Sequence, residues 1–153
     1  MPTIWNFTMS LSVKTVNKCR PLNLGNTTYR MNKTLRVLQL GKFYPIMGGV
    51  EKVMYDLMSG LSERGVPCDM LCALSQGSSR TFSINAHSRL IGCRTWMKVA
   101  ATMISPDMIF SLRKRCRDYD IIHVHHPDPM ACLALFLSGY KGKVILHWHA
   151  DIE

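Results

Sequence analysis

The sequence contains no apolar stretch long enough to cross a membrane as a helix. Its longest apolar run, Met130 to Leu137, falls far short of the roughly 20 residues that a spanning helix needs. The N-terminal segment also lacks the basic start and apolar stretch that mark a secretory signal. We therefore expect a cytoplasmic protein without a spanning helix.

Paired cysteine motifs are absent as well. None of the six cysteines belongs to a Cys-x-x-Cys pair, which is a common mark of zinc and redox sites. All except Cys19 stand within apolar patterns. Buried, reduced thiols are the simplest interpretation, because free cysteine behaves as a small hydrophobic residue and cytoplasmic thiols stay reduced.

Acidic residues are few, with 10 Asp and Glu against 19 Lys and Arg and a formal net charge of +9. A surface of this sign attracts anions such as nucleotides, phosphorylated acceptors, nucleic acid or acidic lipid. The charge is accompanied by no zinc-finger spacing, helix-turn-helix signal or basic stripe interleaved with aromatics. We therefore do not expect nucleic acid as a partner.

The chain divides into a polar leader and one α/β domain. Residues 1–34 show neither sustained alternation nor a helical stripe, which indicates a poorly ordered leader. Met31 precedes the first strong strand pattern, so translation from this methionine would leave residues 1–30 outside the native protein. Residues 35–153 are long enough for one core and too short for two.

Within residues 35–153, β-prone runs alternate with helical patterns. The predicted order is strand 35–40, helix 50–61, strand 70–74, strand 82–91, helix 104–117, strand 120–125, helix 129–137 and strand 143–149. Such alternation is typical of a Rossmann-like parallel sheet flanked by helices, joined by right-handed crossovers. Ligands of these sheets gather beyond the carboxyl ends of the strands.

The loop 41–51 carries Gly48 and Gly49 at the start of the first helix. Adjacent glycines let backbone approach a phosphate closely, and the free amides and dipole of a helix start favour negative charge. The loop is neither Gly-x-Gly-x-x-Gly nor a P-loop. A turn that merely needs positive φ is the alternative interpretation.

Five of the six histidines lie between His123 and His149. Alternation puts His123 and His125 on one face of their strand, and His147 and His149 on one face of theirs. Converging imidazoles favour a metal site, hence a metal-dependent hydrolase as a rival enzyme class. The other alternative is that these rings hydrogen-bond within the core.

The basic run Arg113–Arg115, together with Arg117, has two interpretations. It fits a peripheral contact with anionic membrane at the cytoplasmic face. The alternative, and the commoner case, is that these charges solvate the end of a helix and complement its dipole.

Four motifs in this order resemble the N-terminal domain of family 4 retaining glycosyltransferases. They are Phe43-Tyr44-Pro45, Gly48-Gly49-Val50-Glu51, Asp120-Ile121-Ile122-His123-Val124-His125 and His147-Trp148-His149-Ala150-Asp151. The resemblance implies a GT-B architecture, in which a first Rossmann-like domain binds the acceptor and a second holds most of the nucleotide-sugar. The implied setting is polysaccharide biosynthesis, with a glycan or lipid-linked acceptor.

The resemblance also implies site residues. Gly48 and Gly49 correspond to the turn that faces the donor diphosphate, and His149 to the catalytic histidine that faces the transferred sugar and the acceptor. His125 and Asp151 correspond to acceptor-binding positions. Members of the family need no metal, so we expect no cofactor.

One motif of the family is missing. Its donor-binding domain carries two glutamates separated by seven residues, whereas the only glutamates here are Glu51, Glu63 and Glu153. We therefore expect an incomplete first domain, a missing donor-binding domain and no hexosyltransferase activity from this chain alone. A non-catalytic fragment that binds nucleotide-sugar or acceptor is the remaining alternative.

Overall fold

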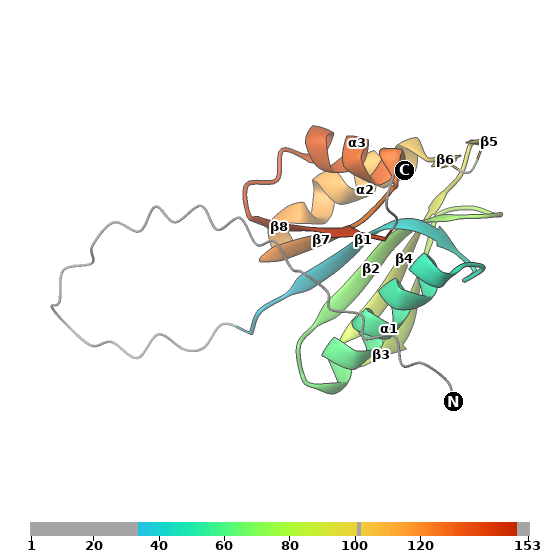
Figure 1. The fold of residues 1–153 in the computed structure, drawn as a ribbon. Helices are drawn as coiled ribbons and strands as arrows, with labels where there is room; N and C mark the ends of the chain where they lie inside the picture. Colours follow the sequence, from blue (N-terminus) through green and yellow to red (C-terminus); the bar gives the residue numbers. More distant parts are fainter. Residues whose placement is uncertain (1–33, 101, 150–153) are drawn as a thin grey trace, which may run out of the picture. The chain divides into compact units, whose positions relative to one another are not determined.

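The computed structural model describes residues 34–100 and 102–149, which form a mostly parallel sheet covered by helices on both faces (Figure 1). Strand order in the sheet is β3-β4-β2-β1-β7-β8. All its neighbouring strands are parallel except β3 and β4, which form an antiparallel pair. The expected Rossmann-like α/β class is confirmed.

The elements follow the predicted alternation closely. Their bounds are β1 Val37–Tyr44, α1 Gly49–Glu63, β2 Cys68–Leu74, β3 Arg80–Asn85, β4 Ser88–Arg94, β5 Met97–Val99, β6 Thr102–Ile104, α2 Pro106–Arg115, a 3-10 turn Cys116–Asp118, β7 Ile121–His126, α3 Pro129–Ser138 and β8 Lys143–Trp148.

Two helices have capping residues at their ends, at the C-terminus of α1 and the N-terminus of α3. Gly65, with φ of +77°, follows α1, and its amide donates to the Ser62 carbonyl. This left-handed glycine closes the helix in the usual manner. At α3, the Asp128 side chain accepts a hydrogen bond from the Ala131 amide and caps the N-terminus.

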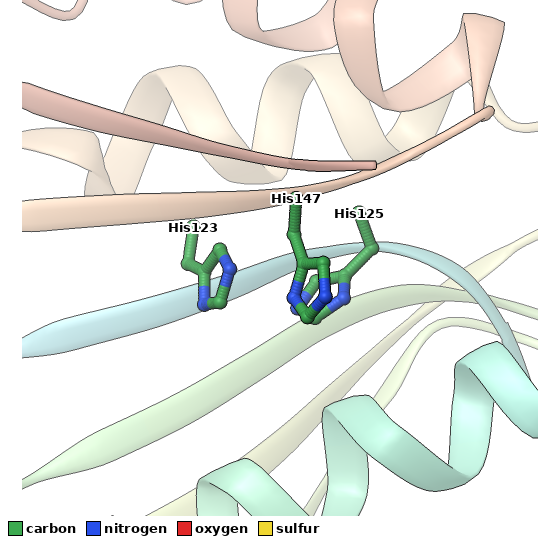
Figure 2. A group of neighbouring side chains, drawn as sticks. All are labelled: His123, His125 and His147. Atoms are coloured by element: carbon green, nitrogen blue, oxygen red, sulfur yellow. The ribbon is translucent and has the colours of Figure 1, made fainter. Parts of the chain in front are cut away.

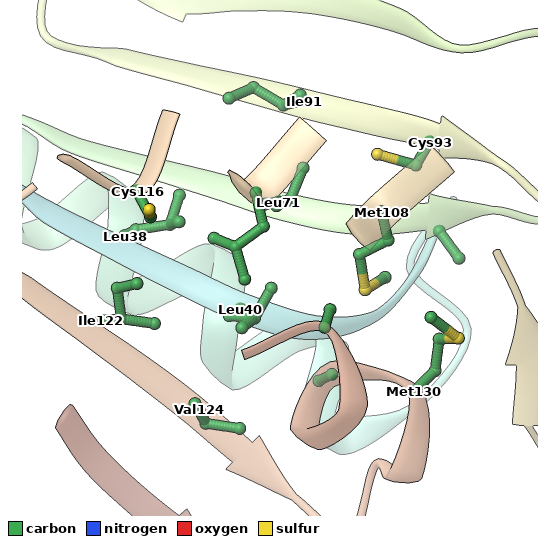
Figure 3. Packing of buried hydrophobic residues seen from close by; sticks show 14 of the residues in the cluster. Leu38, Leu40, Leu71, Ile91, Cys93, Met108, Cys116, Ile122, Val124 and Met130 are labelled. Carbon is green, nitrogen blue, oxygen red and sulfur yellow. The ribbon is translucent and has the colours of Figure 1, made fainter. Parts of the chain in front are cut away.

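Alternation along β1 assigns its side chains to two cores. Leu38 and Leu40 are buried in one cluster with residues of α2 and α3, and Figure 3 shows this cluster, with Met108 of α2 among its members. Val37 lies on the other face, in the cluster that α1 completes with Met54 and Met58. The same period puts Gln39 on the α1 side of the sheet.

The predicted strand over 82–91 is wrong in extent. It is an antiparallel hairpin of β3 and β4, with Ala86 and His87 between the two strands. A short hairpin, β5 with β6, then precedes α2, where the sequence pattern predicts no strand. Both hairpins depend on pairing partners, which a weak local alternation does not reveal.

β1 runs further than predicted, because Gly41 does not end it. Gly41 (φ +132°) and Lys42 (φ +53°) interrupt the pairing with β2, which resumes at Phe43 and Tyr44. This irregularity has the character of a β-bulge. Asp128 holds it, because its carboxylate accepts a hydrogen bond from the Lys42 amide.

The described residues contain no helix long and apolar enough to cross a membrane. The predicted leader, 1–34, lies outside the described residues except for Thr34. The edge strand β8 exposes Val144, Ile145 and Leu146 by 42–58%.

Candidate functional site

The order of the strands predicts a ligand crevice at the carboxyl ends of β1 and β7. β1 pairs with β2 on one side and with β7 on the other. The strands that follow β1 in the chain first lie on the β2 side of the sheet, and β7 and β8 then lie on the opposite side of β1, so the strand order reverses there. Loops that leave the carboxyl ends of two such strands turn apart, and ligands of open α/β sheets bind between them. Here these loops carry Gly48 and Gly49 after β1, and Asp128 after β7.

Neither Gly48 nor Gly49 is required by backbone conformation. Gly48 has an extended backbone (φ −134°, ψ 173°). Among the described residues, the glycines with positive φ are Gly41, Gly65, Gly77 and Gly139, so Gly49 is not one of them. The interpretation that this turn merely needs positive φ is therefore wrong. A Cβ at Gly49 would meet nothing within 4 Å, whereas one at Gly48 would lie 2.5 Å from Glu51 Oε2.

The glycine pair begins α1, whose first intrahelical hydrogen bond runs from the Lys52 amide to the Gly48 carbonyl at 3.2 Å. The amides that precede Lys52 in the first turn have no acceptor within the helix, and they carry the positive end of its dipole. Because Gly49 has no side chain and borders open space, an anion can approach these amides closely.

Histidines line the α1 side of the sheet next to β1 (Figure 2). β7 and β8 pair with His125 opposite His147. Ring centroids are 4.4 Å apart for His123 and His125, 5.3 Å for His123 and His147, and 4.0 Å for His147 and His149. Sequence alternation predicted both pairs, and the parallel register brings the two pairs together.

His125 is the buried centre of this cluster, with 0% of its surface exposed. Its Nε2 lies 2.7 Å from Oε1 of Gln39, and its Nδ1 lies 2.8 Å from Nε2 of His149. Gln39 is also fully buried. This glutamine was not predicted as a site residue, although a polar residue inside the apolar run 35–40 is the kind of signal that marks a buried hydrogen-bonding partner.

Burial favours the neutral form of His123, His125 and His149 by lowering their pKa values. Desolvation, followed by the neighbouring histidines, lowers the pKa of His123 to about 4. The same causes, with a smaller contribution from Lys42, lower the pKa of His125 to about 2. The pKa of His149 is also lowered, mainly by burial, then by His147 and Lys42.

The cluster resembles a metal site in composition. Ring nitrogens of His123, His125 and His147 lie within 4.8 Å of one another, and imidazole is a common ligand of zinc. However, both nitrogens of His125 already have hydrogen-bond partners. A metal bound by all three rings would have to break one of these buried contacts.

Lys42 brings a positive charge to the same edge. From the bulge in β1, its ammonium donates a 2.7 Å hydrogen bond to the Pro127 carbonyl in the loop after β7. Its charge contributes to the lowered pKa values of His125 and His149. Lys42 could not be predicted as a site residue, because its proximity to the histidines depends on the bulge.

The predicted site residues lie at one edge of the sheet where they are described. Gly48 and Gly49 follow the carboxyl end of β1, and His125 and His149 lie at the carboxyl ends of β7 and β8. The His149 amide is held by the His126 carbonyl at 3.0 Å. Asp151 lies outside the described residues.

The predicted basic run lies at the other edge. Arg113, Lys114 and Arg115 form the last turn of α2, which leads back to the amino end of β7. There the three charges complement the negative end of the helix dipole. Arg115 also donates to Ser111 at 2.8 Å.

A mostly parallel α/β sheet, with a glycine-containing helix start at its strand-order reversal, is typical of the class of Rossmann-like domains. The model of glycosyltransferase family 4 matches residues 47–153. The chain belongs to glycosyltransferase family 4.

Two bacterial relatives are similar to this chain. The O-antigen chain mannosyltransferase C of Escherichia coli is 28% identical over 120 residues, which cover 77% of this chain and 32% of that protein. The D-rhamnosyltransferase WbpZ of Pseudomonas aeruginosa is 25% identical over 120 residues, covering 77% and 31%. The chain thus spans about a third of the length of these curated relatives.

Proposed function

We propose that this chain forms the acceptor-side part of a transferase that moves a hexosyl group from a nucleotide-sugar to a glycan or lipid-linked acceptor with retention. The relatives named as mannosyl- and rhamnosyltransferases support the hexosyl class. The reaction takes place at the cytoplasmic face in polysaccharide biosynthesis, and the donor is held mainly by a second domain.

The observation that carries the proposal is Gly49. It begins a helix at the strand-order reversal, needs no positive φ, and leaves open space where a side chain would stand. A glycine without a conformational reason suits close approach of a ligand to the backbone. The donor diphosphate, which is compact and negative, matches the amides at this helix start.

In the proposed reaction, the amides of the first turn of α1 stabilise the negative charge that grows on the diphosphate as the glycosidic bond breaks. Lys42 adds positive potential from the bulge. His149 orients sugar hydroxyls, and the leaving phosphate helps to deprotonate the acceptor hydroxyl. Asp151 stays a predicted acceptor contact, while His125 acts on the acceptor through His149.

The proposal needs no metal, since amides and Lys42 supply the positive charge. A metal-dependent hydrolase stays as the second candidate, because three imidazoles converge within 4.8 Å. The two engaged nitrogens of His125 weigh against it. Membrane contact through Arg113–Arg115 would act at the edge opposite the crevice, so the proposed chemistry does not depend on it.

Binding of GDP to the uniformly ¹⁵N-labelled chain tests the proposal, with guanosine as the matched control without phosphates. The amide resonances of Gly48 and Gly49 are expected to shift with GDP and not with guanosine. UDP is expected to act similarly, because the diphosphate is the shared group. Equal effects of GDP and guanosine, or shifts that avoid α1, would refute a diphosphate site here.

A further inference from the structure

The buried Gln39 amide lies with its Nε2 toward the sulfur of Cys68 and its Oε1 toward His125. Burial raises the pKa of the Cys68 thiol to about 11, so its sulfur keeps its proton. The thiol donates weakly to the Asp69 carbonyl at 4.0 Å, which leaves a sulfur lone pair for Gln39 Nε2 at 3.6 Å. The amide oxygen of Gln39 therefore faces His125.

The orientation of Gln39 determines the proton positions on two histidines in turn. Oε1 of Gln39 can only accept, so Nε2 of His125 must carry the proton at 2.7 Å. His125 is neutral, and its Nδ1 is consequently an acceptor. The nitrogen that lies 2.8 Å away, Nε2 of His149, must donate to it.

The series of hydrogen bonds from Gln39 through His125 ends at the half-buried ring of His149. A neutral imidazole with its proton on Nε2 offers a lone pair, and no proton, at Nδ1. Water cannot replace the contacts behind it, because Gln39 and His125 are both 0% exposed. The opposite tautomer of His149 would set its unprotonated Nε2 against the lone pair of His125 Nδ1, which a buried site disfavours.

We propose that Gln39 and His125 are positioning residues that hold His149 in the Nε2-protonated tautomer, so that its Nδ1 accepts a hydrogen bond from a sugar hydroxyl. The functional part rests on the proposed function above. His149 then selects a hydroxyl that can donate, and it discriminates against sugars in which that hydroxyl is missing or methylated. The role differs from acid catalysis, because the ring presents no proton to the sugar.

Long-range ¹H–¹⁵N spectra of the full chain, labelled with ¹⁵N-histidine, report which ring nitrogen carries the proton. They are recorded well above the ordinary imidazole pKa of about 6.5, and the His149 signals are assigned from the His149→Gln variant. The unmodified chain is expected to show His125 and His149 protonated on Nε2. Protonation of His149 on Nδ1 would overturn the proposal without any further variant.

Two substitutions test the positioning role. Gln39→Leu removes the acceptor at similar length, and the population of Nε2-protonated His149 is expected to fall. Gln39→Glu keeps an acceptor and is expected to keep the tautomer. His123→Gln, on the same face but without a hydrogen bond to His149, serves as the control and is expected to change nothing.

An unchanged tautomer in a folded Gln39→Leu chain would contradict the proposal, with folding checked by circular dichroism. If Gln39→Leu does not fold, the spectra of the unmodified chain and of the Gln39→Glu variant still test the proposal. The spectra need no substrate, so they separate the two proposals. If His149 shows the expected tautomer but the chain does not bind GDP, the proton assignment stands and the proposed contact with a sugar hydroxyl is refuted.

Discussion

The carboxylate of Asp128 accepts a hydrogen bond from the backbone amide of Lys42, 86 positions earlier in the chain. Its second oxygen accepts from the Ala131 amide at 3.1 Å. One buried side chain thereby caps α3 and holds the bulge of β1.

Replacing Asp128 with Ala is expected to lower the free energy of unfolding by about 2–4 kcal/mol, since it removes a helix cap and leaves the Lys42 amide unpaired. Urea unfolding measures the loss. Asp56→Ala is the matched control, because the Lys52–Asp56 pair is exposed (66% and 56%) and its removal should cost about 0.5 kcal/mol or less. Equal losses in the two variants would contradict this account of the bulge.

Gly49→Ala should separate binding from stability. The added methyl meets nothing within 4 Å, and alanine favours a helix over glycine, so stability should be unchanged or rise by up to about 1 kcal/mol. GDP binding is expected to weaken about tenfold, equivalent to about 1.4 kcal/mol, because the methyl stands where the diphosphate approaches.

Gly60→Ala provides the control for that experiment. Gly60 lies within α1, away from the crevice, and a methyl there meets only the flexible end of Arg64 at 3.3 Å. GDP affinity measured by titration calorimetry should be unchanged in Gly60→Ala. Equal affinities in both alanine variants would argue against ligand approach at Gly49.

The neutral histidines predict a loss of stability in acid. Folded pKa values of about 4 for His123 and about 2 for His125 lie below the unfolded value near 6.5. Protons therefore bind the unfolded chain more tightly, and stability present above pH 6.5 declines as the pH falls toward 4 and below. A fully buried histidine contributes a slope of up to about 1.4 kcal/mol per pH unit.

Urea unfolding from pH 8 to pH 5 measures the first part of this decline. The decline begins near the unfolded histidine pKa of about 6.5 and continues toward the folded His123 pKa of about 4. His123→Gln should make the slope shallower, whereas His87→Gln, at an exposed turn, should leave it unchanged. A slope that is the same in all three chains would mean that the cluster is not the cause.

Metal removal distinguishes the transferase from the hydrolase candidate. We expect purified chain to contain no stoichiometric transition metal, and its melting temperature to be unchanged by EDTA. Elemental analysis and thermal melts provide the measurements. Stoichiometric zinc that disappears in His123→Ala and His147→Ala chains would instead support the hydrolase.

Much of the fold could be predicted because hydrophobic periods and helix ends are local signals. The Gly65 cap and the face shared by His123 and His125 follow from spacing alone. The bulge at Gly41 could not be predicted, because a glycine after an apolar run also ends many strands. Its place inside β1 depends on Asp128, far along the chain.

The site was predictable in its residue types and less so in its connections. Sequence alternation indicates which histidines share a face, but only the parallel register of β7 and β8 sets His125 beside His147. The contact of His125 with Gln39 crosses from β7 to β1. Such contacts follow from strand order, which local patterns do not encode.

The central claim is that a diphosphate at the start of α1 and the imidazole of His149 share one crevice. The most direct test is a titration of the ¹⁵N-labelled chain with pyrophosphate, following the Gly49 amide and the His149 ring nitrogens in one sample. The account predicts that both respond with the same midpoint. A response of the Gly49 amide that leaves His149 unchanged, or no response at Gly49, would contradict it.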